Sequence, residues 1–360
     1  MSKHDQEHRD IERRLFQIAE ALSAEERNLL NNPAGLVRAA DFIEKYFLHI
    51  GLKVIRQTFQ VDGIDCYNIE AVTHDFCGLG EPHWVIGAHY DSAPGTLGAD
   101  DNISAVAILL ETSRLLTLSV NPPRNIRFVA FTNEEPPHFG TESMGSRVHA
   151  QSCRKNGDNI QGMICLESLG YFSDKPGTQD LPTIYGMPQE TIAFMRSRGI
   201  KPTIGNYVAI VGDEHSAALL AMFDEAFSPG MSMPTLPLVM PEMRLSDHLC
   251  YWDEGYPALM LTDTAPYRNP NYHKTTDTVE TLDLQAMASI TLQLVQAMPR
   301  LSFRAGGIQQ AKDGNLNSLW RRLLGSKKLS KEHYKRDFFC CSNSSCVKAP
   351  CSFNFQSLSI

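Results

Sequence analysis

The chain has 360 residues, of which 42% are hydrophobic and 21% charged, a composition typical of a globular protein that buries a substantial core. No apolar run approaches the roughly 18 residues of a membrane span, and the polar start of the chain is unlike a secretory signal. The net charge of −8 argues against a nucleic-acid partner, and nine scattered cysteines without paired spacing favour a cytoplasmic location.

Helix and strand patterns alternate along the first part of the chain. The spacing of apolar residues predicts helices over 11–22 and 36–47. Residues 53–61 and 67–72 are rich in β-forming residues and are expected to pair at the edge of a sheet. Residues 84–90 form a short, nearly all-apolar run, which is typical of a central strand covered on both faces.

The alternation continues toward the C-terminus. A buried helix is predicted over 103–118, and a long amphipathic helix over 282–298 closes the series. The elements between them are helices over 141–150 and 189–198 and strands over 126–131, 163–166 and 258–261. This order predicts an α/β fold, a three-layer αβα sandwich around a mostly parallel, mixed central sheet. Functional residues are then expected at the carboxyl ends of the strands.

Two later segments have no regular pattern. Residues 229–243 are rich in Met and Pro, and we expect a covering loop whose edge reaches a pocket. The triplet Ser246-Asp247-His248 follows it. Its histidine is either a surface or supporting residue or a contact for the substrate.

The composition changes near the C-terminus. Residues 301–360 hold ten Lys and Arg against three Asp and Glu, together with four of the nine cysteines. We therefore predict one folded domain over 1–305 and a basic, Cys- and Ser-containing tail over 306–360 that is poorly ordered. Residues 316–329 combine apolar and basic side chains at helical spacing, which fits either a membrane-surface helix or a helix packed on the domain.

Polar residues follow several of the predicted strands directly. His89 and Asp91 come at the end of the 84–90 run. A neutral imidazole is a good zinc ligand, and a carboxylate two residues on can hold its ring in one tautomer. A histidine satisfied inside the core would give the same pattern.

Acidic residues recur at three further places. Asp100 and Asp101 open the helix over 103–118, where they also suit the end of a helix. Glu134 and Glu135 follow the strand over 126–131, and a solvated turn is the alternative to a cation between them. Glu167 follows an apolar strand, where a carboxylate is costly unless it is paired or metal-bound.

A second histidine completes the set. Tyr272 and His273 stand in a loop near the end of the domain, with Asp277 four residues further on as a supporting partner. Two histidines and three carboxylates are ligand types that zinc accepts, but five are too many for one tetrahedral site. If one carboxylate bridges, the set accommodates two metal ions.

Five separated motifs resemble, in order, those of the di-zinc aminopeptidase family, metallopeptidase family twenty-eight. They are His89-Tyr90-Asp91-Ser92, the GADDNIS segment at 98–104, Asn133-Glu134-Glu135, Gly145-Ser146 and Tyr272-His273. Bacterial leucyl aminopeptidase is a member, and glutamate carboxypeptidase II and glutaminyl cyclase are distant relatives. The resemblance runs from about residue 33 to 300 and implies the zinc exopeptidase fold.

The resemblance also implies a role for each residue. Two zinc ions per chain are expected, with Asp101 as the bridging ligand and with four terminal ligands, His89, Glu135, Glu167 and His273. Asp91 is expected to orient His89, Glu134 to act as the general base and Tyr272 to polarise the substrate carbonyl. The sequence departs from the family at Ala105, where a Gly is usual, and at Glu167, where many aminopeptidases have Asp.

The implied function is that of a zinc-dependent exopeptidase that removes N-terminal residues from a peptide or a small aminoacyl substrate. Three alternatives stay open at this point: a single-zinc glutaminyl-peptide cyclotransferase, a carboxypeptidase, and a non-catalytic receptor on the same fold. The sequence does not determine the preferred side chain, the oligomeric state or the role of the tail.

Overall fold

The structure, a computed structural model, describes residues 3–304 except 74, 75, 77, 120–122, 124 and 181–188. The predicted tail over 306–360 and its boundary lie outside the described residues, so that division stays a prediction. Within the described part, no helix is both long and apolar enough to cross a membrane. The four cysteines described there are buried free thiols.

The strands of the described residues form one eight-stranded sheet in the order β1-β2-β4-β3-β5-β8-β6-β7. They are β1 (Lys53–Val61), β2 (Ile64–Val72), β3 (His83–His89), β4 (Ile126–Phe131), β5 (Ile160–Glu167), β6 (Val208–Gly212), β7 (Thr235–Val239) and β8 (Ala258–Thr262). The central strands β4, β3, β5 and β8 run parallel, whereas β2 and β6 pair antiparallel with them on either side. The predicted mixed sheet with a parallel centre is confirmed.

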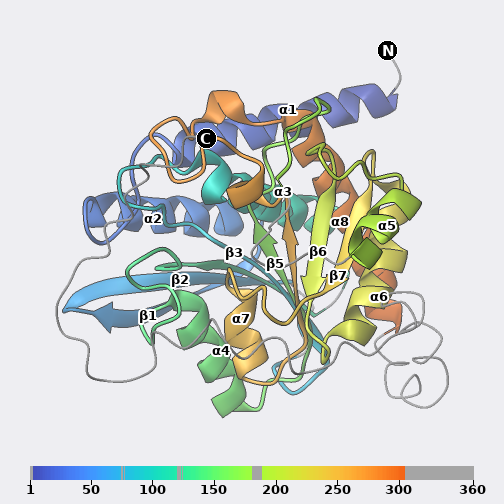
Figure 1. Cartoon of the computed structure of the whole chain (residues 1–360). Coiled ribbons are helices and arrows are strands. Elements are labelled where there is room, and N and C mark those ends of the chain that lie inside the picture. Colours follow the sequence, from blue (N-terminus) through green and yellow to red (C-terminus); the bar gives the residue numbers. More distant parts are fainter. Residues whose placement is uncertain are drawn as a thin grey trace, which may run out of the picture.

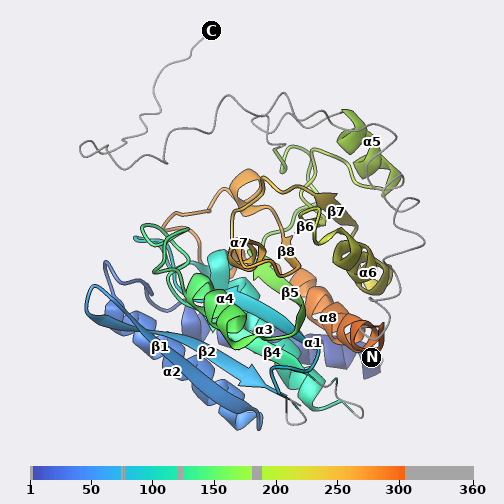
Figure 2. The ribbon, with the colours of Figure 1, turned by 90° about the horizontal axis from the view of Figure 1, so that it is seen from below.

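Helices cover both faces of the sheet. One face carries α1 (Lys3–Leu22), α2 (Pro33–His49), α3 (Ala105–Thr117), α6 (Ala217–Phe227) and α8 (Leu284–Arg304). The opposite face carries α4 (Gly145–Asn156) and α7 (His248–Asp253), which lie together in Figures 1 and 2. A further helix, α5 (Gln189–Ser197), packs beside β6 and β7. The result is the predicted three-layer αβα sandwich.

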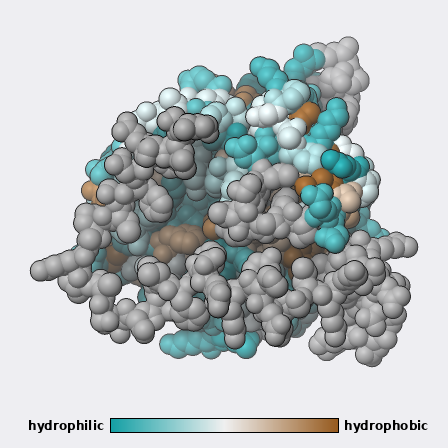
Figure 3. All heavy atoms as spheres, in the orientation of Figure 1, coloured by the Kyte–Doolittle hydropathy of each residue, from teal (hydrophilic) through white to brown (hydrophobic). Residues whose placement is uncertain are grey.

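The central strands are apolar because both of their faces are buried. All seven residues of β3 are buried, and alternate side chains serve different layers. Ile86 packs into the cluster under α1, α3 and α8, whereas Val85 packs into the cluster under α4 and α7. Gly87 must lack a side chain, because a Cβ there would lie 2.4 Å from the ring of Phe131. On the face seen in Figure 3, most of the coloured surface is hydrophilic and hydrophobic residues form small separate areas.

The structure differs from the sequence-based expectation in several elements. The sequence analysis predicted neither β6 nor the helices α6 and α7, and two segments that it did describe differ in form. The predicted covering loop over 229–243 contains the edge strand β7, so the loop interpretation is wrong for Thr235–Val239. β7 contains Pro237, which is tolerated there because β7 is an edge strand, where one row of N–H groups has no partner strand. The helix predicted over 103–118 is preceded by a wider turn, η1 (Ala99–Ser104), which carries the acidic residues.

Candidate metal centre

The predicted site residues meet at one edge of the sheet. Because β4, β3 and β5 are parallel neighbours, their carboxyl ends lie side by side. His89 is the last residue of β3 and Glu167 the last of β5, while Glu134 and Glu135 follow β4. Asp101 reaches the same place from η1, in front of α3.

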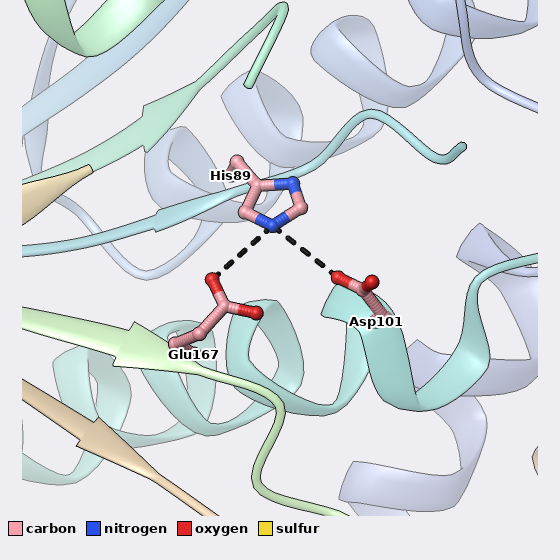
Figure 4. Close-up of side chains that lie close together, drawn as sticks. All are labelled: His89, Asp101 and Glu167. Atoms are coloured by element: carbon pink, nitrogen blue, oxygen red, sulfur yellow. Dashed lines mark ion pairs between the residues drawn. The ribbon is translucent and has the colours of Figure 1, made fainter. Parts of the chain in front are cut away.

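The first ligand set consists of His89, Asp101 and Glu167. His89 Nε2 lies 3.5 Å from Asp101 Oδ1 and 3.4 Å from Glu167 Oε2. Figure 4 shows both carboxylates directed at this one nitrogen. The three candidate ligand atoms lie within 4.8 Å of one another, which is close enough for one ion to contact all three.

The second ligand set consists of Asp101, Glu135 and His273. His273 Nε2 lies 3.1 Å from Asp101 Oδ2 and 3.4 Å from Glu135 Oε2. Asp101 therefore presents one oxygen to each histidine. A carboxylate shared in this way is the arrangement that a two-metal centre requires.

Unpaired polar atoms show that these residues fit a cation. His89 Nε2, the nitrogen that faces the first ligand set, and Oε1 of Glu135 are buried without a hydrogen-bond partner. Buried polar atoms without partners are rare and cost free energy, and a metal ion would satisfy them.

The pKa shifts of Glu134, Glu135 and His273 also fit a cation site. Burial, aided by the charge of Asp101, raises the pKa of Glu135 to about 7. Burial opposes a charge on His273, but its hydrogen bonds to Asp101 and Glu135 raise the pKa of that ring to about 10. Burial and the charges of Glu167 and Glu135 raise the pKa of Glu134, against the charge of His89. Protons therefore occupy this centre in the absence of metal and would be released on metal binding.

Two further carboxylates hold the acidic segments in place. Asp91 accepts hydrogen bonds from the backbone N–H groups of Glu134 (3.1 Å) and Glu135 (3.0 Å), and it lies 3.4 Å from His89 Nδ1. Asp277 accepts from the backbone N–H groups of Asp100 (2.9 Å) and Asp101 (3.2 Å). Each acidic pair is thus positioned by one carboxylate that binds two successive backbone donors.

A cavity of about 320 Å³ opens onto the two ligand sets. Tyr272 lines it and stacks on His273, with ring centroids 4.0 Å apart and planes inclined by 15°. Part of its wall is apolar and is formed by Pro136, Phe139, Met243, Leu245, Met260, Pro266 and Tyr267. The expectation that the 229–243 segment reaches a pocket is met at Met243. A second cleft, between α1, α2 and α3, contains none of the predicted site residues.

Sequence reasoning missed the role of the 246–248 triplet. Ser246 Oγ donates to Glu167 Oε2 at 2.5 Å. Asp247 is fully buried, and neither of its carboxylate oxygens has a partner. His248, the residue singled out from the sequence, is buried and bonded through Nε2 to the carbonyl of Met243, and it does not line the cavity. A surface position for His248 is therefore wrong.

Arg27 was also missed, because a single arginine between two helices carries no motif. It is fully buried, and its guanidinium donates, at 2.8–3.3 Å, to the backbone carbonyls of Leu22, Glu25, Tyr90, Leu97 and Gly98. Burial lowers its pKa to about 10, so the side chain stays charged at neutral pH. Arg27 thereby fastens both ends of the loop that joins His89 to η1.

Comparison with known proteins decides the family. The model of Peptidase family M28 matches residues 68–298. The chain belongs to this family. The resemblance seen in the order of the motifs is confirmed, and with it the enzyme class, a zinc metallopeptidase.

Individual relatives agree with this placement. Over 276 residues the chain is 37% identical to the uncharacterized protein YfbL of Escherichia coli, covering 72% of this chain and 79% of that protein. Over 118 residues it is 48% identical to the aminopeptidase YwaD of Bacillus subtilis, covering 33% of this chain and 24% of that protein.

Solved structures of the same fold include two kinds of enzyme. The LapA aminopeptidase of Legionella pneumophila has a TM-score of 0.61 at 17% identity, over 84% of this chain and 76% of that one. A glutaminyl cyclase of Porphyromonas gingivalis has a TM-score of 0.59 at 16% identity, over 81% of this chain and 98% of that one. At these identities the likeness concerns the fold alone.

Proposed function

We propose that this chain is a di-zinc aminopeptidase that releases N-terminal residues from peptides or small aminoacyl substrates. One observation carries the proposal: Asp101 points one oxygen at His89 and the other at His273, and each histidine has its own further carboxylate. His89 and Glu167 would hold one zinc ion, Glu135 and His273 the other, and Asp101 would bridge them.

Charge balance supports two ions rather than one. Four carboxylates that line the cavity lie around the two histidines, those of Asp101, Glu134, Glu135 and Glu167. Two divalent ions would neutralise all four charges. A single ion would leave buried carboxylates to repel one another, which is costly in a site of low polarity.

When bound, zinc lowers the pKa of a water molecule and polarises the substrate carbonyl. Glu134 lines the cavity but belongs to neither ligand set, so its carboxylate is free to move protons. It would take a proton from the attacking water and pass it to the leaving nitrogen. Tyr272 lines the same cavity, and its hydroxyl would donate a hydrogen bond to the oxygen on which negative charge develops.

The cavity favours a substrate with a free amine. Among the described residues that line it, four are acidic and none is Lys or Arg; the acidic residues are Asp101, Glu134, Glu135 and Glu167. A carboxypeptidase needs a cation for the terminal carboxylate of its substrate, whereas carboxylates attract an α-ammonium group. The two complete ligand sets disfavour the single-zinc cyclotransferase and the non-catalytic receptor. The name of YwaD, an aminopeptidase, supports the same conclusion.

Metal analysis combined with a substrate panel tests the proposal. We expect two zinc ions per chain, activity that is lost with a chelator and restored by zinc, and hydrolysis of L-leucine p-nitroanilide but not of its N-acetyl derivative. One tightly bound metal together with pyroglutamate formation from an N-terminal glutamine peptide would favour the cyclotransferase instead. Release of C-terminal residues would show a carboxypeptidase.

A further inference from the structure

The two oxygens of Glu167 are held by two different serines. Oε2, the oxygen that lies 3.4 Å from His89 Nε2, accepts a hydrogen bond from Ser246. Oε1 accepts a hydrogen bond of 3.0 Å from Ser168 Oγ. Glu167 and Ser168 both line the cavity, and 13% of the Glu167 side chain is exposed. The Glu167 carboxylate therefore has one oxygen that faces His89 and the proposed metal, and a second oxygen that Ser168 holds.

Ser168 reaches Glu167 from an unfavourable backbone conformation. Its φ is +43°, in the left-handed region that costs a residue with a side chain roughly 1–2 kcal/mol. Two hydrogen bonds impose this conformation. The Ser168 N–H donates to Asn102 Oδ1 at 2.9 Å, and the Ser168 carbonyl accepts from Asp263 N–H at 2.8 Å.

The groups that impose this strain lie next to residues of the site. Asn102 directly follows Asp101, and Asp263 directly follows β8. Because hydrogen bonds from these two neighbouring segments hold Ser168 in a conformation that it does not favour by itself, its position is a candidate for a functional role.

We propose that Ser168 is a positioning residue that divides Glu167 between metal and substrate. By holding Oε1, it keeps Glu167 from turning both oxygens onto one zinc ion, and it leaves Oε1 available to the α-ammonium group of the substrate. Ser168 lines the cavity but is itself only 1% exposed, so we assign its effect to the hydrogen bond that it gives to Glu167. This inference rests on the proposed aminopeptidase function.

The length of the side chain explains why two serines are needed. Glutamate has one more rotatable bond than aspartate, so its carboxylate has more orientations to choose from. A carboxylate binds zinc through one oxygen or through both, and a hydrogen bond to the second oxygen favours the first mode. Ser246 restrains the oxygen on the metal side and Ser168 the oxygen on the cavity side.

A pair of alcohols that differ only in the amine tests the proposal on the zinc-loaded enzyme. L-leucinol carries the α-amine and 4-methylpentan-1-ol lacks it. We expect Ser168→Ala to raise the inhibition constant of L-leucinol about tenfold or more, the typical effect of losing one hydrogen bond to a charged group. In the same variant the inhibition constant of 4-methylpentan-1-ol and the affinity for zinc should both stay unchanged. KM for L-leucine p-nitroanilide should rise more than kcat falls.

Two further variants complete the test. Ser168→Gly removes the hydroxyl and also relieves the left-handed strain, so it should fold at least as well as Ser168→Ala and show the same loss of L-leucinol affinity. Ser246→Ala should instead weaken zinc binding, which a competition with a chelator measures.

The outcomes separate this inference from the proposed function. Wild-type affinity for L-leucinol in both Ser168 variants would overturn the inference, as would an equal loss for both alcohols. If the wild-type enzyme itself bound the two alcohols equally and failed to hydrolyse aminoacyl substrates, the aminopeptidase proposal would fall with it.

Discussion

Glu134 and Glu135 are neighbours in the sequence, but their carboxylates have different partners. Glu135 Oε2 lies 3.4 Å from His273 Nε2 and belongs to a ligand set. Glu134 Oε2 lies 3.6 Å from His89 Nε2 and belongs to none. Asp91 fixes this difference, because it holds both backbone N–H groups and so directs the two side chains.

Replacing Glu134 by Gln should therefore separate catalysis from metal binding. The amide has the same shape but cannot accept a proton, so we expect kcat to fall by about 10²–10⁴ while zinc content stays at the wild-type level. Glu135→Gln is the matched variant and should lose zinc instead. Zinc analysis beside kcat measurements decides the matter, and the reverse pattern would contradict the assigned roles.

The ligands could be predicted from the sequence because each stands beside an easily recognised element. His89 and Glu167 end apolar strands, and an ionisable side chain is unusual at such a position. Ser168, Ser246 and Arg27 could not be predicted in this way. Serine and arginine are common in loops, and their roles depend on contacts between segments distant in the chain.

At the scale of elements, the segment between α1 and α2 supports the metal centre from outside the region matched by the family model. Arg27 lies in this segment, and the matched region begins at residue 68. Its hydrogen bonds to Tyr90 and Gly98 clamp the loop that leads from His89 to Asp101. Losing the guanidinium would leave buried carbonyl groups without donors.

We expect Arg27→Met to lower the free energy of unfolding by roughly 3 kcal/mol or more, since several buried acceptors lose their partner at once. Zinc affinity should fall as well, because the clamped loop positions Asp101. Arg38 provides the control: its side chain is 59% exposed in a surface pair with Glu25, so Arg38→Met should change stability by about 1 kcal/mol or less. Urea unfolding measures both variants, and equal effects would show that Arg27 has no special role.

A second buried cluster joins β2, β4 and α4 on the face away from α3. Arg127 binds Glu70 at 2.8 Å, and His149 Nε2 lies 3.1 Å from the same carboxylate. Burial opposes a charge on Glu70, but the hydrogen bonds from His149 and Arg127 outweigh it and lower the pKa of Glu70 to about 2. Burial also opposes charge on His149, yet Cys153 and Glu70 raise the pKa of that ring to about 9.

These shifts predict how stability depends on pH. The contribution of His149, whose pKa is raised from 6.5, is complete below pH 6.5 and is lost as the pH rises through 9. The contribution of Glu70, whose pKa is lowered from 4.5, is complete above pH 4.5 and is lost as the pH falls toward 2. Urea unfolding of the zinc-loaded protein between pH 6.5 and 9.5 should show a decline on the order of 1–3 kcal/mol. His149→Gln should remove most of it, and an unchanged decline in that variant would contradict the assignment.

The strands around the site were easier to predict than β6 and β7. β3 and β4 are fully buried, and such apolar runs are recognisable without neighbours. β6 and β7 have five residues each, and β7 contains Pro237. Short runs of this kind become strands only through pairing with the rest of the sheet, which local sequence does not reveal.

For the molecule as a whole, α8 is the last described element and ends at Arg304. Its apolar face packs into the main core, with Met287, Ile290 and Leu294 fully buried. Every candidate ligand precedes it. A chain that ends at residue 306 should therefore stay folded, bind zinc and hydrolyse small substrates within about fivefold of the full-length rate, about 1 kcal/mol in activation free energy. Matched assays of the two chains test this, and loss of zinc would show that the tail belongs to the enzyme.

The order of the ligands along the chain has a consequence for synthesis of the protein. His89, Asp101 and Glu167 are all present once β5 has been made, but His273 comes more than a hundred residues later. The second ligand set, and with it the two-metal centre, is absent from every shorter nascent chain. A di-zinc peptidase assembled in this order would therefore stay inactive at least until His273 has been translated.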